Sequence, residues 1–510
     1  MDTVPHSEDH RWRHWFLLLG PLLGISLSVA CGFGTEMTIE QILLVGVTTW
    51  TATWWVTEAL PVPATSLIPL AMLPVLGITT HRDTAAAYGD SLILLLMGGF
   101  MMSRAMESNG AHRRIAVALV RGAGRIGGDS PRVVILGFMI ASAFLSMWIS
   151  NTATTLMLLP VALAVISGSE DRRIAAPLLL GLAYAANIGG IGTPIGTPPN
   201  VIFMGAIETL PTTTEPFGFV RWMMIGVPVV LVMVPVAWLW LTRRVPSDAS
   251  FTLPPSERWT RPQVMVVLVF GFAALLWITQ KYPTFTVADM DANLGGWTGV
   301  IYWMSGGAID ARFSGSATVA ILVVLLMFLL PTGGGHRVLA WDDARRIPWG
   351  ILLLFGGGIA LARAFQATDL SGVIATQLGL LRDVPIPVVI VVICLFTTFL
   401  TEITSNTALT ALLMPILAST AVAIDVDPVV LMAPAAMSAS CAFMLPVATA
   451  PNAVVYGSEQ VPMRTMMREG LVLNLIGVVV ISTAAMTLAS TLGDDDVAVS
   501  DEAVVRDVVG

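Results

Sequence analysis

The sequence predicts an all-α, polytopic membrane protein with about eleven transmembrane helices and two re-entrant helical hairpins. Three observations lead to this fold class. The 510 residues are 55% hydrophobic and only 12% charged, with a mean hydropathy of +0.80, whereas soluble proteins are about one quarter charged. Apolar runs of about 20 residues, the length that crosses a bilayer, recur along the chain. The second half of the chain also repeats motifs of the first half.

The apolar runs define the crossings in chain order. The first run follows the basic stretch 10–14 but is longer than the core of a signal peptide, so we interpret it as an uncleaved helix. The fifth and tenth crossings are interrupted near their middle by Thr, Pro and Gly or Ala. The predicted crossings are 15–32, 40–57, 62–79, 91–108, 175–207, 221–242, 263–280, 317–331, 348–365, 429–458 and 471–491.

Two further apolar segments, 135–168 and 389–422, are broken by polar residues and are predicted to enter and leave the membrane on one side. This assignment gathers most basic residues on the cytoplasmic side if the N-terminus is cytoplasmic and the C-terminus lies outside. The chain is therefore expected in the inner (cytoplasmic) membrane of a cell. The cytoplasmic set is Arg11, Arg13, Arg113, Arg114, Arg121, Arg125, Arg132, Arg172, Arg173, Arg243, Arg244, Arg258, Arg261, Arg337, Arg345, Arg346, Arg464 and Arg468; the outer set is Arg82, Arg221, Lys281, Arg312, Arg382 and Arg506.

The hairpins and the interrupted crossings carry the internal repeat. Residues 150–152 and 405–407 both read Ser-Asn-Thr, and each is followed by a proline at the same spacing. The break at 193–200 matches the break at 445–452, and both end in Pro-Asn. An odd number of crossings separates each motif from its partner, so the two halves are predicted to be inverted. Inverted repeats with interrupted helices indicate a transporter with its substrate site at mid-membrane.

Each predicted hairpin tip offers both kinds of helix end. The first half-helix ends in free carbonyls near Ser150 or Ser405, which suit a cation, and the second begins with free N–H groups near Thr152 or Thr407, which suit an anion. The amides of Asn151 and Asn406 can serve either ligand. A single Ser-Asn-Thr could equally form a helix–helix hydrogen-bond cluster, but two copies in register favour a binding site.

No Lys, Arg or His occurs in the two hairpins or the two breaks. A divalent anion at membrane depth would therefore have no side-chain counter-charge, and its burial would be very costly. Co-bound cations are the expected remedy, so we predict coupling to Na⁺. Glu402, three residues before Ser405, could tune a cation site, although an ion pair or a water-facing carboxylate is an equal alternative.

Other function classes fit poorly. A P-loop needs Gly-Lys followed by Ser or Thr, and the only lysine, Lys281, follows Gln280. None of the six His lies in the broken segments, where a catalytic base would be needed, so an enzyme is not expected. The three Cys have neither metal nor disulfide spacing, and no resident cofactor is expected.

At these residues the sequence resembles the divalent anion:sodium symporter (DASS) family, and in particular its bacterial and archaeal Na⁺/dicarboxylate symporters. The resemblance rests on 54–63, both Ser-Asn-Thr tips, Asn187–Gly190, 193–200 and 448–452, and it extends over about 15–491. It implies a homodimeric elevator. Its parts would be an N-terminal tail at 1–14, a scaffold at 15–133 and 247–388, a transport domain at 134–246 and 389–492, and an acidic tail at 493–510.

The family pattern also implies site residues. One Na⁺ would be held around Ser146, Ser150, Asn151 and Gly196, and the second around Thr401, Thr404, Asn406 and Ala448. The substrate would meet Asn151, Thr152, Thr197, Asn406, Thr407 and Ala450. Thr197 stands where bacterial dicarboxylate carriers often have Ser, and Ala450 stands where Pro is common.

The expected function is sodium-coupled symport of divalent anions, most simply C4-dicarboxylates such as succinate. The alternatives are an obligate dicarboxylate exchanger and a sulfate or tricarboxylate carrier of the same fold. Expected partners are the lipid bilayer, Na⁺, the anion and a second copy of the chain, with no nucleic acid.

Overall fold

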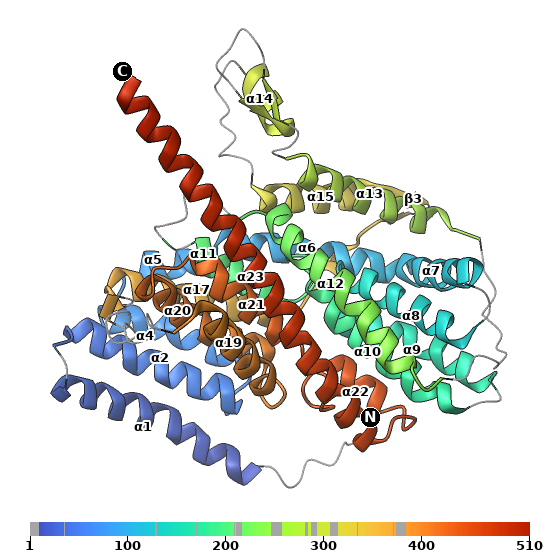
Figure 1. The fold of residues 1–510 in the computed structure, drawn as a ribbon, viewed down its shortest axis with the longest axis horizontal. Helices are drawn as coiled ribbons and strands as arrows, with labels where there is room; N and C mark the ends of the chain where they lie inside the picture. Colours follow the sequence, from blue (N-terminus) through green and yellow to red (C-terminus); the bar gives the residue numbers. More distant parts are fainter. Residues whose placement is uncertain are drawn as a thin grey trace.

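The structure of this protein is a computed structural model. It describes residues 10–34, 36–127, 130–169, 172–208, 210, 217–245, 258–280, 284–286, 293–305, 315–333, 335–370, 372–373 and 384–509. Lys281, Arg312 and Arg382 of the predicted outer set, and residues 1–9 of the N-terminal tail, lie outside these ranges. The described chain is mostly helical, as the sequence predicts (Figure 1).

The N-terminal helices form one group. Helices α1 and α2 pack side by side along one edge of the molecule (Figure 1). Gly110, with φ of +67°, makes the reversal between α6 and α7. Arginines and apolar residues recur at helical spacing in α7, which packs on α8. The bounds are α1 His10–Gly34, α2 Ile39–Thr57, α3 Val62–Thr65, α4 Leu67–Val75, α5 His81–Tyr88, α6 Ser91–Ser108 and α7 Ala111–Gly127.

Both segments predicted as hairpins are pairs of helices joined by a short turn. The first pair is α8 (Pro131–Ser146) and α9 (Asn151–Ser167); the second is α19 (Ile386–Leu400) and α20 (Asn406–Ala423). The predicted crossings at 175–207 and 429–458 are broken helices. The first consists of η1 (Arg172–Ile174), α10 (Ala175–Gly190) and α11 (Pro198–Glu208), and the second of α21 (Pro428–Ala439) and α22 (Ala450–Tyr456).

The remaining helices connect these broken elements. They are α12 Phe219–Thr242, α13 Arg261–Ile278, α14 Gly296–Met304, α15 Ser316–Leu329, α16 Trp341–Ala344, α17 Trp349–Ala367 and α23 Met463–Val509. The acidic tail predicted at 493–510 thus continues the last helix as far as Val509. The all-α prediction misses two antiparallel ribbons, β1 Thr284–Thr286 with β2 Asn293–Gly295, and β3 Pro331–Gly333 with β4 His336–Arg337.

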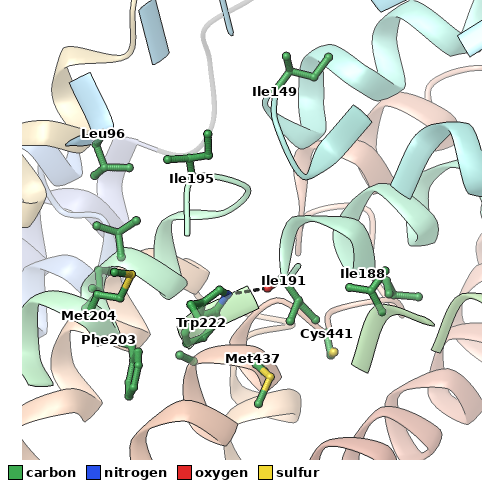
Figure 2. Packing of buried hydrophobic residues seen from close by; sticks show 14 of the residues in the cluster. Leu96, Ile149, Ile188, Ile191, Ile195, Phe203, Met204, Trp222, Met437 and Cys441 are labelled. Carbon is green, nitrogen blue, oxygen red and sulfur yellow. Dashed lines mark hydrogen bonds between the residues drawn. The ribbon is translucent and has the colours of Figure 1, made fainter. Parts of the chain in front are cut away.

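Several helix contacts hold this arrangement together. Helix α6 packs on α15, where Gly98 permits close approach to Ala320, and α17 packs on α4 and α5. Arg363 of α17 pairs with Asp90 at the start of α6, 2.5 Å away. The broken helices pack on the hairpins, and α23 packs on α12, α19 and α21. The buried core runs between α10, α11, α12 and α21, where Phe203, Trp222 and Met437 lie close together (Figure 2).

Seven helices of the described chain have the length and apolar composition to cross a membrane. Seven more are apolar but shorter, among them the helices of the first hairpin and α10, α19 and α21. Short helices are expected here, because the polar breaks divide apolar stretches that are long in the sequence. The prediction of a multi-pass membrane protein is confirmed, while the number of crossings stays a prediction.

Candidate functional site

The first hairpin tip is a tight, capped turn between α8 and α9. Ser150 is the N-cap of α9, and its hydroxyl accepts a hydrogen bond from the amide of Ala153 at 3.1 Å. The buried Ser146 hydroxyl donates to Oδ1 of Asn151 at 2.5 Å. Two oxygen atoms, one hydroxyl and one amide, therefore face each other where α8 ends and α9 begins.

The second tip has the same hydrogen bonds. Ser405 caps α20 through the amide of Ala408, at 3.5 Å. The buried Thr401 hydroxyl donates to Oδ1 of Asn406 at 2.6 Å and also lies 2.9 Å from the carbonyl oxygen of Ala439. A hydroxyl has one proton, so it can serve one of these acceptors at a time. Three oxygen atoms converge here, and such a set suits a hard cation.

The first amide groups of α9 and α20 point out of the hairpins. Among the described residues, the backbone N–H groups of Asn151, Thr152, Asn406 and Thr407 donate to no acceptor. All four residues are half-buried. Unpaired N–H groups at a helix N-terminus, with the positive end of the helix dipole, form a site suited to a carboxylate or another oxyanion.

The first break is fixed by Asn200 and lies against the first tip. Asn200 is buried, and its Nδ2 donates to the carbonyl oxygens of Gly190 at 2.8 Å and Thr193 at 2.7 Å. A methyl group added to Gly196 would collide with the carbonyl oxygen of Gly190. Asn151 and Thr197 in turn surround Gly190, since a methyl group there would lie 2.9 Å from Asn151 Oδ1 and 3.2 Å from Thr197 Cβ.

The second break repeats this arrangement in a more open position. Asn452 is buried, and its Nδ2 donates to the carbonyl oxygens of Ala442 and Leu445, both at 3.0 Å. The Thr449 hydroxyl caps α22 through the amide of Asn452 at 3.3 Å. The first break is buried from 191 to 197, whereas Val447 in the second is 80% exposed.

Helix α10 joins the two halves of the site. Asn187 Nδ2 donates to the Thr449 hydroxyl at 3.0 Å and to Asn452 Oδ1 at 3.3 Å. Gly190, which contacts Asn151, lies three residues further along and therefore on the same helix face. One face of α10 thus brings the first tip beside the second break. Helix α9 packs on α22 and α20 packs on α11, so each tip helix contacts the broken helix of the other half.

The predicted site residues differ in which of their atoms could contact a ligand. Ser146, Asn151, Thr197 and Gly196 lie together around Gly190, and Thr401 and Asn406 are in direct contact. Ser150 uses its hydroxyl as a cap and its carbonyl to accept from Thr154. The Thr404 hydroxyl donates back to the Leu400 carbonyl at 2.8 Å. Ala448 is half-buried and Ala450 is exposed, and neither offers a side-chain ligand.

Sequence reasoning missed the residues that support the site. Asn187, Asn200 and Asn452 position the breaks, and Gly190 allows the close approach of Asn151. The sequence does contain a signal for the three asparagines, because an Asn within a membrane segment needs a hydrogen-bond partner. Asn200 and Asn452 also end the two Pro-Asn breaks. The alternatives of an ion pair or a water-facing role for Glu402 are wrong, since Glu402 is buried and no described basic residue forms an ion pair with it.

A known protein family and two known transporters are similar to this chain in sequence. The sequence model of the citrate transporter family matches residues 52–433. The sodium-dependent dicarboxylate transporter SdcS of Staphylococcus saprophyticus is 36% identical over 480 residues, covering 91% of this chain and 89% of that protein. SdcS of Staphylococcus aureus is 35% identical over 479 residues with the same coverage.

Solved structures share the fold at low sequence identity. The YdaH transporter of Alcanivorax borkumensis aligns with a TM-score of 0.54 and 15% identity, covering 93% of this chain and 96% of that chain. MtrF of Neisseria gonorrhoeae, which belongs to a class of antimetabolite efflux pumps, aligns with a TM-score of 0.55 and 13% identity at the same coverage. These structural similarities show a shared fold and nothing more.

Proposed function

The chain belongs to the citrate transporter family, and from this membership together with its paired hairpin tips we propose that it is a sodium-coupled symporter of C4-dicarboxylates such as succinate. It is a transporter and not an enzyme, as the family indicates. Its staphylococcal relatives are sodium-dependent dicarboxylate transporters, which supports both the sodium ion and the dicarboxylate.

The observation that carries the proposal is the repeated tip. At each tip a hydroxyl and an amide oxygen lie 2.5 or 2.6 Å apart, and the next two backbone N–H groups are unpaired among the described residues. Oxygen pairs suit Na⁺, and N–H groups suit a carboxylate. Because the segments 135–168, 193–200, 389–422 and 445–452 contain no basic residue, bound Na⁺ is the available counter-charge for a dianion.

We assign the ligands in two sets. The first Na⁺ is held around Ser146, Ser150, Asn151 and Gly196, and the second around Thr401, Thr404, Asn406 and Ala448. The dicarboxylate meets Asn151, Thr152 and Thr197 at one end and Asn406 and Thr407 at the other, with Ala450 at the rim. The contact of α10 with both halves supports a site shared between them.

The proposed mechanism is an elevator built from an inverted repeat. The hairpins and broken helices pack on one another across the two halves, which supports a transport domain of 134–246 and 389–492. A small cavity between α11 and α20 on one side and α17 on the other is lined almost entirely by apolar side chains, including Ile202, Phe355 and Met414. Such a surface would let the domain slide against the scaffold at 15–133 and 247–388. A homodimer with a cytoplasmic N-terminus completes the proposal.

Uptake of labelled succinate into proteoliposomes tests this function. We expect uptake to require an inward Na⁺ gradient, to fall to background when choline replaces Na⁺, and to be competed by malate and fumarate. Asn151→Ala and Asn406→Ala should each abolish it. Activity that survives both single changes would refute the site assignment.

The same assay separates the alternatives. Uptake stimulated by internal succinate without any need for Na⁺ would identify an obligate exchanger. Competition by sulfate or citrate at lower concentration than by malate would identify a different anion as the substrate.

A further inference from the structure

Glu402 is a buried carboxylate that the proposed function does not use. It lies next to Thr401 in the second tip and is 3% exposed. Its Oε1 accepts from the backbone amides of Phe443 at 2.7 Å and Met444 at 2.8 Å, and its Oε2 accepts from Leu445 at 3.0 Å. Three consecutive amides of the second break are therefore bound to one side chain.

Asn474 of α23 completes this cluster. Its Nδ2 donates to Glu402 Oε1 at 2.8 Å, and its Oδ1 lies 3.2 Å from the amide of Phe443. Asn474 is fully buried. An ionised carboxylate only accepts hydrogen bonds, and four N–H donors surround this one. The three backbone amides and one N–H of Asn474 are all directed at the carboxylate, so the role of Glu402 is to hold the backbone.

Glu402 and Asn474 thus clamp the segment 443–445, and among the described residues of the first half no side chain binds the amides of the first break in this way. Met147 stands three residues before Ser150, as Glu402 stands three residues before Ser405. There the Thr193 hydroxyl donates to the Met147 carbonyl oxygen, and Trp222 Nε1 donates to the Ile191 carbonyl oxygen at 2.8 Å (Figure 2). Both breaks are held through carbonyl oxygens, by Asn200 and by Asn452, but the more exposed second break is held through its amides as well.

We propose that Glu402 and Asn474 are positioning residues for the second cation site alone, so that the two Na⁺ sites depend on different supports. This inference rests on the proposed function for the identity of the ion. The clamped segment 443–445 lies next to Ala442 and includes Leu445, whose carbonyls accept from Asn452. The amide of Ala448 in turn donates to the Leu445 carbonyl at 3.3 Å. The clamped segment also follows the end of α21, where the Ala439 carbonyl oxygen lies 2.9 Å from the Thr401 hydroxyl, so releasing the clamp is expected to disturb the second cation site.

Two variants test the clamp separately from its charge. Glu402→Gln removes the charge and places an NH₂ donor opposite the amide of Leu445, whereas Asn474→Ala keeps the charge and removes one donor and one acceptor. In the full-length protein in nanodiscs, we expect amide hydrogen exchange at 443–445 to accelerate about tenfold or more in both variants, because a hydrogen bond to a charged group is lost or weakened. Exchange at 191–196 should stay as in the parent.

Sodium dependence of succinate uptake is the second readout. Both variants should raise the Na⁺ concentration for half-maximal uptake about tenfold. Met147→Leu, the matched control in the first half, should leave it within twofold. Unchanged exchange at 443–445 in both variants would overturn the clamp. Faster exchange with an unchanged Na⁺ requirement, or an equal shift in Met147→Leu, would overturn the positioning role.

These results are distinguishable from failure of the proposed function. If uptake by the parent protein does not need Na⁺, the symport proposal fails at that step. The exchange measurement then still decides whether Glu402 holds the second break.

Discussion

Gly190→Ala tests whether the first tip and first break form one binding site. Gly190 ends α10 and has no side chain between the Asn151 amide and Thr197. A methyl group there would lie 2.9 Å from Oδ1 and 3.1 Å from Nδ2 of Asn151. Ordinary contact distances are about 3.5–4.0 Å, so the carboxamide must move by roughly 0.5–1 Å.

We expect Gly190→Ala to reduce the transport rate and to leave the stability of the fold nearly unchanged. Replacing Gly by Ala in a helix favours folding by up to about 1 kcal/mol, which offsets part of the local strain. A shift of about 1 Å in a positioned group can reduce a rate by about 100-fold. Sodium-driven succinate uptake should therefore fall by about two orders of magnitude, while the thermal unfolding midpoint in detergent changes by a few degrees at most.

Gly168→Ala is the control. Gly168 follows α9 at the end away from the tip, and a methyl group there would lie 3.5 Å from the Ala164 carbonyl oxygen, within ordinary contact. This variant should transport like the parent. If Gly190→Ala also transports within twofold of the parent, with the same Na⁺ requirement, the contact between Gly190 and Asn151 does not define the site and the reasoning fails.

Two further predictions concern the residues that support the breaks. Asn187→Ala should raise the succinate concentration for half-maximal uptake about tenfold, because it leaves the buried Asn452 Oδ1 without its donor. Ser142→Ala, which removes a buried donor to the Leu182 carbonyl elsewhere on α10, serves as the control, and equal effects of the two changes would contradict a specific role. Trp222→Phe should destabilise the protein by about 1–3 kcal/mol, since Ile191 loses its indole donor. Trp240→Phe should be nearly neutral in the same thermal assay, because its Nε1 has no partner among the described residues, and an equal drop in both variants would contradict this account.

The broken elements could be predicted from the sequence because their signals are local. Apolar length fixes where α8, α9, α19 and α20 lie, and the polar tripeptide fixes where each hairpin turns. The predicted N-terminal ends of α9 and α20 fall where Ser150 and Ser405 cap them. The hydroxyl partners of Asn151 and Asn406 lie five residues away in the chain, within the same hairpin.

The other features depend on long-range packing or on weak patterns. Helix α7 escapes a hydropathy search because arginines alternate with its apolar residues along the sequence and lower the mean hydropathy of the segment. The bond from Asn187 to Thr449 joins residues 262 positions apart, and the bond from the Phe443 amide to Glu402 joins the second break to the second hairpin. The different burial of the two breaks cannot follow from motifs that are alike. It arises because Ile195 of the first break packs against Gly99 of α6, while Val447 has no such neighbour.

The hydroxyl–amide pairs at the two tips bear on how a carrier cycle can close. In each pair the hydroxyl proton lies between the hydroxyl oxygen and the amide oxygen. The two oxygen atoms are therefore hydrogen-bonded to each other when no ion is bound. An arriving Na⁺ would turn that proton aside and take both oxygens, and on release the proton would return. In the proposed elevator, this hydrogen bond would keep both oxygen atoms paired when no ion is bound, which would lower the cost of crossing the bilayer without cargo. An obligate exchanger cannot return without substrate. A low free-energy cost for the return of the unloaded tips therefore favours net uptake over one-for-one exchange.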